Sequence, residues 1–92
     1  QAERNYVLWL ESEQRKGRIK GWRYEVPIVL HEPGGKEVSK YLCDFEVDFG
    51  NHIEYHEVKG AWTPVARLKW KHARLEYHNR IFKEIKAKDL RR

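Results

Sequence analysis

Apolar side chains recur along this chain with two different periods, and these periods predict its helices and strands. Over residues 2–16 the apolar positions follow the 100° spacing of an α-helix. Gly17 comes directly after this segment and can end the helix, because glycine readily adopts the left-handed backbone of a C-cap. The apolar arc of this predicted helix consists of Tyr6, Val7 and Leu10.

Three strands are predicted after the first helix. They cover residues 22–31, 38–49 and 52–59. The first is rich in β-branched and aromatic side chains, and Pro27 marks it as an edge strand or as the place of a bulge. Residues 32–36 form a turn, and Gly50 with Asn51 forms a tight hairpin into the third strand. The three strands are therefore expected to pair mostly antiparallel.

A second helix and a short strand complete the pattern. Thr63 can cap a helix whose first residue is Pro64, and this helix is predicted over residues 64–78. Residues 80–85 are predicted as a last strand, and residues 86–92 as a charged tail. The order helix, three strands, helix, strand predicts one α/β domain.

Basic side chains gather along one side of the predicted second helix. They are Arg67, Lys71, Arg74 and His78. The opposite side carries Val65, Leu68, His72 and Leu75, and beyond them Ala66, Trp70, Ala73 and Tyr77. The basic side is either a solvated face or, next to an acidic site, a surface that contacts phosphates. Lys69 lies within the non-basic arc, so its stem either lies along the sheet or carries the ammonium toward carboxylates or a bound phosphate.

Composition narrows the class of protein. The 92 residues suit one small domain, and 19 basic against 14 acidic residues give a net charge of +5, which favours a polyanionic partner such as nucleic acid. The single cysteine, Cys43, points to a reducing compartment, and its apolar strand face favours a core residue over a nucleophile. No apolar run has the length of a membrane span. The chain lacks methionine and begins within the predicted helix, which is typical of a trimmed fragment.

An acidic pair with a lysine is the main chemical signal. Residues two apart on a strand point the same way, so Glu57 and Lys59 share a face while Val58 points to the other. Strand pairing can bring Asp44 beside them. Two carboxylates about 4 Å apart repel by roughly 4 kcal/mol at an effective dielectric of 20, so such a pair is typical of a divalent-cation site. Glu3, in the apolar arc of the first helix, is either part of this site or a frayed first-turn residue in solvent.

These residues resemble the motif of the PD-(D/E)XK nuclease superfamily. Asp44 matches its first acidic position, the triplet of Glu57, Val58 and Lys59 matches (D/E)-x-K, and Glu3 matches the acidic residue that many members carry on the first helix. The segments YLCDFEV, EVKG and LKWKHA are similar to those of small phage-encoded nucleases akin to Holliday junction resolvases and other junction or flap endonucleases. Cys43 stands where the motif's name has proline, a departure common in the superfamily.

The resemblance implies a restriction-endonuclease-like αβββαβ core over residues 1–92, with a mixed central sheet flanked by helices. It also implies a Mg²⁺-dependent endonuclease, with Mn²⁺ able to substitute. Asp44, Glu57 and the backbone carbonyl of Val58 would hold the ion, and Lys59 would position the attacking water or offset charge in the transition state. Glu3 would bind a second ion or orient a hydrated one.

The resemblance further implies a DNA substrate, most simply branched DNA, in a bacterial or phage-infected cytoplasm. Phosphate contacts are expected from Arg67, Lys69, Lys71 and Arg74. The sequence shows no base-reading helix of a known type, so recognition of DNA structure rather than of base sequence is expected. A four-way junction needs two symmetric cuts, which favours a homodimer.

Three other interpretations compete with the nuclease. Zinc binding would use Cys43 with histidines, but the spacing of paired zinc ligands is missing. The segment Tyr77, His78 and Asn79 looks superficially like an HNH nuclease but lacks a second histidine and the ββα-metal context. The strongest alternative is a non-catalytic nucleic-acid-binding module with incidental carboxylates.

Overall fold

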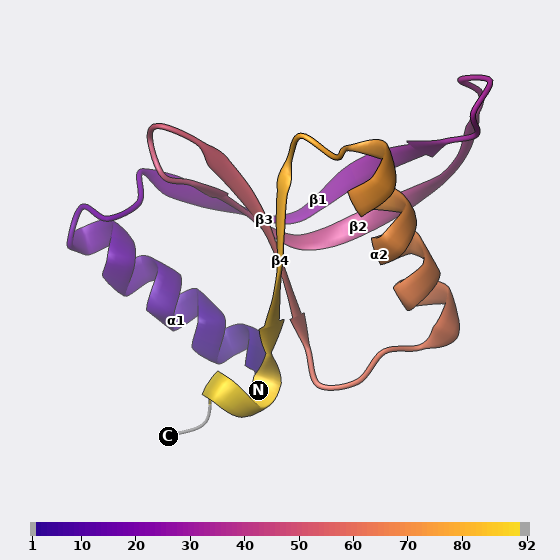
Figure 1. Ribbon diagram of the computed structural model, residues 1–92. Helices are drawn as coiled ribbons and strands as arrows, with labels where there is room; N and C mark the ends of the chain where they lie inside the picture. Colours follow the sequence, from indigo (N-terminus) through magenta and orange to yellow (C-terminus); the bar gives the residue numbers. More distant parts are fainter. Residues whose placement is uncertain (1, 91–92) are drawn as a thin grey trace.

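Four strands form one mixed sheet in the computed structural model, which describes residues 2–90. The strands are β1 (Gly21–His31), β2 (Glu37–Asp48), β3 (Ile53–Lys59) and β4 (Ile81–Lys86). They lie in the order β1-β2-β3-β4, with β1, β2 and β3 antiparallel and β3 and β4 parallel. Helices α1 (Ala2–Arg15) and α2 (Pro64–Glu76) flank the sheet (Figure 1). The predicted α/β class and αβββαβ order are confirmed.

Local sequence signals account for the ends of these elements. Thr63 caps α2, because its Oγ1 accepts a hydrogen bond from the N–H of Ala66 at 3.2 Å. Gly17, after α1, has φ +78°, and Gly50, in the β2–β3 hairpin, has φ +94°. Both values lie in the left-handed region that glycine enters at little cost. Pro27 lies on β1, which is an edge strand as predicted, so its missing N–H leaves no gap inside the sheet.

The core consists of two clusters, one beneath each helix. The cluster beneath α2 contains Ile28, Leu30, Tyr41, Cys43, Tyr55, Trp70 and Ala73. The cluster beneath α1 contains Tyr6, Leu10, Ile19, Phe45, Val47 and Val58. Strands β1 and β2 form a long hairpin that extends past the body of the domain (Figure 1), and β2 contributes to both clusters. Cys43 is fully buried, which confirms it as a core residue.

The C-terminal segment differs from the predicted tail. Lys86 ends β4, and Ala87–Leu90 forms a 3-10 helix, η1, that lies against the N-terminal part of α1 (Figure 1). These four residues of the predicted charged tail are therefore helical, and they reach α1 because the parallel β4 strand carries the chain back to the start of that helix. Residues 91 and 92 lie outside the described residues.

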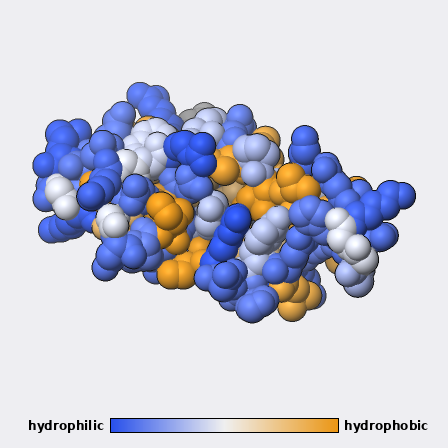
Figure 2. Space-filling model, turned by 90° about the horizontal axis from the view of Figure 1, so that it is seen from above, coloured by the Kyte–Doolittle hydropathy of each residue, from blue (hydrophilic) through white to orange (hydrophobic). Residues whose placement is uncertain are grey.

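Helix α2 buries only one of its two non-basic sides. Trp70 and Ala73 are buried against the sheet, whereas Val65, Leu68 and Leu75 are 64%, 67% and 78% exposed. Apolar side chains also reach the surface elsewhere, in separate patches among hydrophilic residues (Figure 2). The helical wheel alone could not separate these sides, because both carry apolar side chains and the choice depends on how α2 rotates against the sheet.

Candidate active site

Asp44 and Glu57 face each other across the β2–β3 pair. The register joins Phe45 to His56, so the antiparallel geometry sets Asp44 opposite Glu57. Each carboxylate accepts a hydrogen bond from the backbone of the other strand. The N–H of Val58 donates to Asp44 Oδ2 at 2.9 Å, and the N–H of Asp44 donates to Glu57 Oε1 at 3.2 Å. The backbone itself therefore orients both acidic side chains.

Glu57 is the more deeply buried of the two carboxylates, with 2% of its surface exposed. The Tyr41 hydroxyl donates to Glu57 Oε1, and Lys59 Nζ lies 3.1 Å from Glu57 Oε2. A buried carboxylate is costly unless donors surround it, and here a phenol, an ammonium and a backbone N–H supply them. These donors hold Glu57 in one orientation, as a metal ligand or a structural ion pair requires.

Asp44 is less buried than Glu57, but its surroundings disfavour the charged form of its side chain. Burial, and after it the charge of Glu57, raise the pKa of Asp44 from 3.8 to about 7. Glu3 acts in the same direction, whereas the Val58 N–H and the Lys59 ammonium oppose this rise in the pKa of Asp44. Near neutral pH the pair is therefore close to taking up a proton. A divalent cation would lower this electrostatic cost, since it offsets both negative charges.

The donor set of the acidic pair fits a hard divalent cation. Asp44 and Glu57 offer carboxylate oxygens, which are the ligands that Mg²⁺ prefers. Among residues 2–90, no three His, Cys, Asp or Glu side chains converge in an arrangement that could hold a metal ion. Mg²⁺ commonly takes one or two carboxylates and completes its shell with water and substrate phosphates, so two side-chain ligands suffice. The Val58 carbonyl stays a predicted ligand.

The raised pKa of Asp44 predicts how the stability of the metal-free protein depends on pH. Between the ordinary pKa of 3.8 and the folded value of about 7, folded Asp44 keeps a proton that the unfolded chain has lost. Raising the pH through this window therefore lowers the free energy of unfolding. Asp44→Asn cannot ionise, so its unfolding temperature should rise relative to wild type as the pH is raised from about 4 to about 7.

Thermal unfolding in EDTA at several pH values measures this difference. Asp48→Asn, on the same strand, controls for the loss of one negative charge. A difference between wild type and Asp44→Asn that is constant across the window would contradict the raised pKa of Asp44.

Lys59 lies beside the acidic pair, as the strand alternation predicts. Its Nζ pairs with Glu57 and also lies 5.2 Å from the centre of the Trp62 ring. An ammonium over an aromatic face gains a cation–π attraction. The Lys59 side chain remains 26% exposed, so the carboxylate and the ring hold it at an open edge of the site.

Trp62, in the loop between β3 and α2, is a further candidate residue of the site that the sequence pattern does not indicate. Its ring lies 5.2 Å from Lys59 Nζ and 5.6 Å from the Arg67 guanidinium. The indole N–H donates to Glu84 Oε2 on β4 at 2.9 Å. Trp62 thus links the candidate catalytic lysine to the basic side of α2. No periodicity could find it, because its contacts depend on the path of an irregular loop.

Glu3 is neither frayed nor fully exposed. The Tyr24 hydroxyl on β1 donates to Glu3 Oε1 at 2.7 Å, and the Glu3 side chain is half-buried. Its charge also contributes to the raised pKa of Asp44. Glu3 therefore lies in an ordered first turn of α1, with a partner on β1, rather than in a frayed turn. Its role with a second ion remains a prediction.

A residue with a strained backbone, Glu25, lies on strand β1 next to the acidic pair. Glu25 on β1 falls opposite Asp44 between two ladder pairs, and its φ is +56°. This left-handed backbone costs a residue other than glycine about 1–2 kcal/mol, and such residues cluster at functional sites. At the same point β2 changes sides, because Cys43 packs beneath α2 and Phe45 beneath α1. The acidic pair therefore lies where the β1–β2 hairpin twists from one helix to the other.

Lys69 does not reach the carboxylates. Its Nζ donates instead to the backbone carbonyl of Lys40 at 3.1 Å, so the side chain lies along the sheet. Of the predicted basic stripe, Arg67, Lys71 and Arg74 are exposed on α2, and His78 is exposed just beyond the end of the helix. Arg67 lies over Trp62, and the Arg74 guanidinium lies 6.0 Å from the centre of the Trp70 ring. The structure thus supports the stripe as a surface and separates Lys69 from it.

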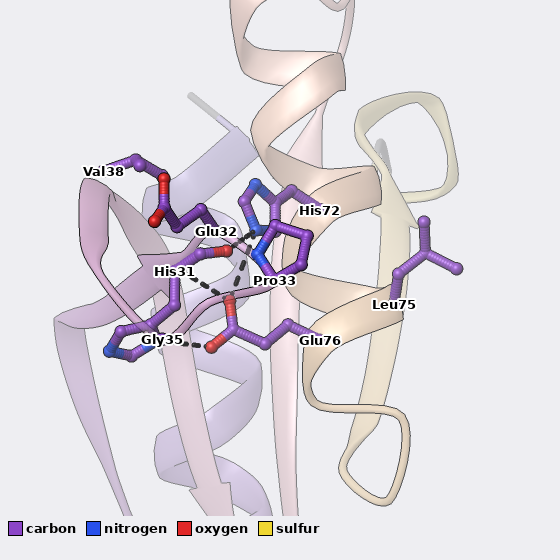
Figure 3. A pocket seen from close by; sticks show the side chains of 8 residues that line it. All are labelled: His31, Glu32, Pro33, Gly35, Val38, His72, Leu75 and Glu76. Carbon is purple, nitrogen blue, oxygen red and sulfur yellow. Dashed lines mark hydrogen bonds and ion pairs between the residues drawn. The ribbon is translucent and has the colours of Figure 1, made fainter.

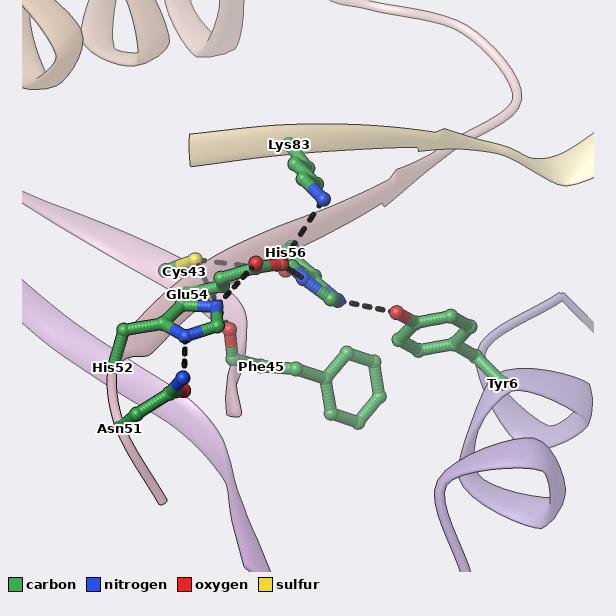
Figure 4. A network of polar contacts seen from close by, with 8 residues as sticks. All are labelled: Tyr6, Cys43, Phe45, Asn51, His52, Glu54, His56 and Lys83. Atoms are coloured by element: carbon green, nitrogen blue, oxygen red, sulfur yellow. Dashed lines mark hydrogen bonds and ion pairs between the residues drawn. The ribbon is translucent and has the colours of Figure 1, made fainter. Parts of the chain in front are cut away.

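The buried histidine has partners other than the acidic pair. His56 Nε2 lies 2.8 Å from Glu54 Oε1, and its Nδ1 contacts the Tyr6 hydroxyl (Figure 4). Glu54 also lies 2.7 Å from His52 Nε2 and 3.3 Å from Lys83 Nζ. Burial lowers the pKa of His56, although Glu54 acts against that shift. Through the contact between Tyr6 and His56, this polar network connects α1 to the sheet.

A second histidine cluster lies at the far end of α2. Glu76 bridges His31 and His72, with Oε2 2.5 Å from His31 Nδ1 and Oε1 3.3 Å from His72 Nε2 (Figure 3). These side chains border a cavity of about 890 Å³ between the β1–β2 turn and α2, which Leu75 and Val38 also line. The bridge fixes the end of α2 to β1, and neither cluster contains a residue of the candidate active site.

No protein-family model, curated protein or solved structure matches this chain. The relationship to the PD-(D/E)XK superfamily therefore stays a resemblance that rests on Asp44, Glu57, Lys59 and the order of elements.

Proposed function

We propose that this chain is a Mg²⁺-dependent endodeoxyribonuclease of the PD-(D/E)XK type, in which Mn²⁺ can substitute. One observation carries the proposal: crossed backbone hydrogen bonds hold Asp44 and Glu57 together, and Lys59 lies 3.1 Å from Glu57. The αβββαβ order supports it, because the resemblance requires these residues on neighbouring strands just before a helix.

Each residue has a distinct role in this proposal. Mg²⁺ held by Asp44, Glu57 and the Val58 carbonyl would polarise the scissile phosphate and lower the pKa of an attacking water. Hydrolysis forms a bond from the water oxygen to phosphorus and breaks the bond to one sugar oxygen, which leaves with a proton. Lys59 would orient the water or offset the negative charge that grows on the phosphate. Tyr41 would act as a positioning residue, since its hydroxyl fixes Glu57.

The proposed substrate is DNA, recognised by its branched structure rather than by base sequence. The net charge of +5 and the exposed basic side chains of α2 support a polyanionic partner. The alternative is a module that binds nucleic acid without cutting it, in which the pair of Glu57 and Lys59 is only a structural ion pair. Both functions would share the basic surface, so cleavage must distinguish them.

The proposal also covers the cellular compartment and the oligomeric state of the protein. Neither helix within residues 2–90 is long and apolar enough to cross a lipid bilayer. The proposed setting is the cytoplasm of a bacterium or of its phage-infected form, and the proposed assembly is a homodimer, because two symmetric cuts resolve a four-way junction.

A panel of labelled DNAs tests the function directly. It contains four-way junctions, flaps, single strands and linear duplexes, each incubated with Mg²⁺, Mn²⁺ or EDTA. We expect cleavage of branched DNA with either ion and no cleavage in EDTA. Binding to these DNAs without cleavage under any of these conditions would favour the non-catalytic alternative.

The basic stripe predicts a salt dependence of DNA binding. Each phosphate contact removed should lower the slope of log affinity against log salt by about 0.9 on duplex DNA. A variant with alanine at Arg67, Lys71 and Arg74 should therefore lose up to about 3 in slope. The matched control carries alanine at Arg15, Lys16 and Lys20, which are exposed near the end of α1. Equal slopes for both variants would make the stripe merely a solvated face.

A further inference from the structure

A cavity of about 680 Å³ opens between the first turns of α1 and the start of β1. Two aromatic rings, two charged side chains and small apolar groups line it: Trp22, Tyr24, Glu3, Arg4, Ala2, Val7 and Val58. Its volume falls within the usual range of small-molecule sites.

The cavity adjoins the candidate active site. Val58 lines it, and the N–H of Val58 donates to Asp44. Glu3 lines it as well, and its Oε1 accepts a hydrogen bond from the Tyr24 hydroxyl, which is another lining residue, at 2.7 Å. A molecule seated here would therefore lie next to the phosphate that Asp44 and Glu57 would bring to the metal.

The rings of Trp22 and Tyr24 both pack on a buried aromatic residue, which fixes their positions. Trp22 and Tyr24 are two residues apart on β1, so they point to the same side. Both contact the fully buried Phe45, with ring centres 5.9 Å and 5.3 Å away. Tyr24 is nevertheless 49% exposed. An exposed ring fixed on a buried one offers a preformed surface for stacking.

The chemistry of the walls favours a nucleobase over a bare phosphate. Glu3 would repel a phosphate, but a carboxylate accepts hydrogen bonds from the N–H groups of bases. Every base has a flat π-face that stacks on aromatic side chains. Arg4 is exposed and can contact the phosphate that flanks such a base.

We propose that this cavity binds an unpaired nucleobase of DNA beside the phosphodiester to be cut, which makes the enzyme selective for flaps and other substrates with unpaired nucleotides there. The inference rests on the proposed nuclease function. A base inside an intact duplex hides both faces in the stack, so paired DNA must first extrude it at a cost in free energy.

Binding in EDTA tests the cavity without cleavage. The probes are a flapped DNA with 2-aminopurine in the unpaired segment and a fully paired duplex of equal length, and 2-aminopurine fluorescence reports stacking. Tyr24→Leu should weaken binding of the flapped DNA by about tenfold and change duplex binding by less than about twofold. Tyr24→Phe keeps the ring and should bind the flap like wild type. Trp9→Leu removes a 39% exposed ring outside the cavity lining and should leave both affinities unchanged.

Trp22→Leu should weaken binding of the flapped DNA in the same way as Tyr24→Leu. Because Trp22 packs against the core cluster beneath α1, the folding of the Trp22→Leu variant is checked by circular dichroism. Tyr24 is exposed enough to keep the test valid if Trp22→Leu unfolds. The cavity assignment is overturned if Tyr24→Leu binds the flapped DNA as tightly as wild type does, or if it loses as much affinity for the duplex as for the flapped DNA. In either case, cleavage by the wild-type protein in Mg²⁺ would still support the nuclease function. A loss of affinity that is confined to the flapped DNA supports the cavity assignment. If the wild-type protein then cleaves none of the DNAs in Mg²⁺, only the proposed nuclease function is overturned.

Discussion

Asp44→Asn should lose DNA cleavage by about 10³-fold or more while its affinity for DNA stays equal or rises. The amide oxygen of asparagine can still accept the hydrogen bond from Val58, which Asp44 Oδ2 accepts at 2.9 Å, so the local backbone should survive. What disappears is the negative charge that would hold Mg²⁺. Losing that charge also lessens the repulsion of DNA phosphates, which is why binding should not weaken.

Glu57→Gln should have the same effect on cleavage for the same reason. Single-turnover cleavage at saturating DNA, together with binding in EDTA, measures both variants. Asp48→Asn provides the matched control on β2 and should cleave like wild type. If Asp44→Asn and Glu57→Gln both cut DNA at near wild-type rates, the acidic pair is not the metal site.

Lys59→Ala separates an enzyme from a binding module most clearly. If Lys59 orients water or offsets transition-state charge, its loss should reduce turnover by roughly 10²-fold and leave Mg²⁺ affinity nearly unchanged, because lysine is not a metal ligand. If Lys59 is only the ion-pair partner of Glu57, at 3.1 Å, its loss should lower stability modestly and leave turnover per folded molecule unchanged.

The measurement is single-turnover cleavage at saturating Mg²⁺, corrected for the folded fraction. Lys69→Ala is the matched control, since Lys69 Nζ donates to the Lys40 carbonyl rather than to the acidic pair. A normal rate for Lys59→Ala would remove this lysine from the mechanism.

Local patterns suffice for the order of elements, because each element is marked by signals close in sequence. The alternation over β2 and β3 predicts that Glu57 and Lys59 share a face, and the ion pair between them agrees. Thr63 with Pro64 begins α2, and Gly17 follows α1. Such signals act within a few residues, through caps, turns and strand pleating.

Tertiary structure alone decides which side chains support the candidate site. Tyr41 and Asp44 are three apart and would point to opposite sides of a flat strand, yet the Tyr41 hydroxyl reaches Glu57 beside Asp44. The twist of the hairpin brings them together, and twist accumulates over whole strands rather than residing in a local pattern. Trp62 likewise meets Lys59 only through the path of its loop.

The sequence by itself determined the αβββαβ order and the shared face of Glu57 and Lys59, because these follow from periodicity and short-range signals. Only the tertiary structure decided that Lys69 lies along the sheet, that Glu3 meets Tyr24, and that Val65, Leu68 and Leu75 stay exposed. Each of these depends on how a helix rotates and docks against a twisted sheet, which is set by packing between residues far apart in the chain.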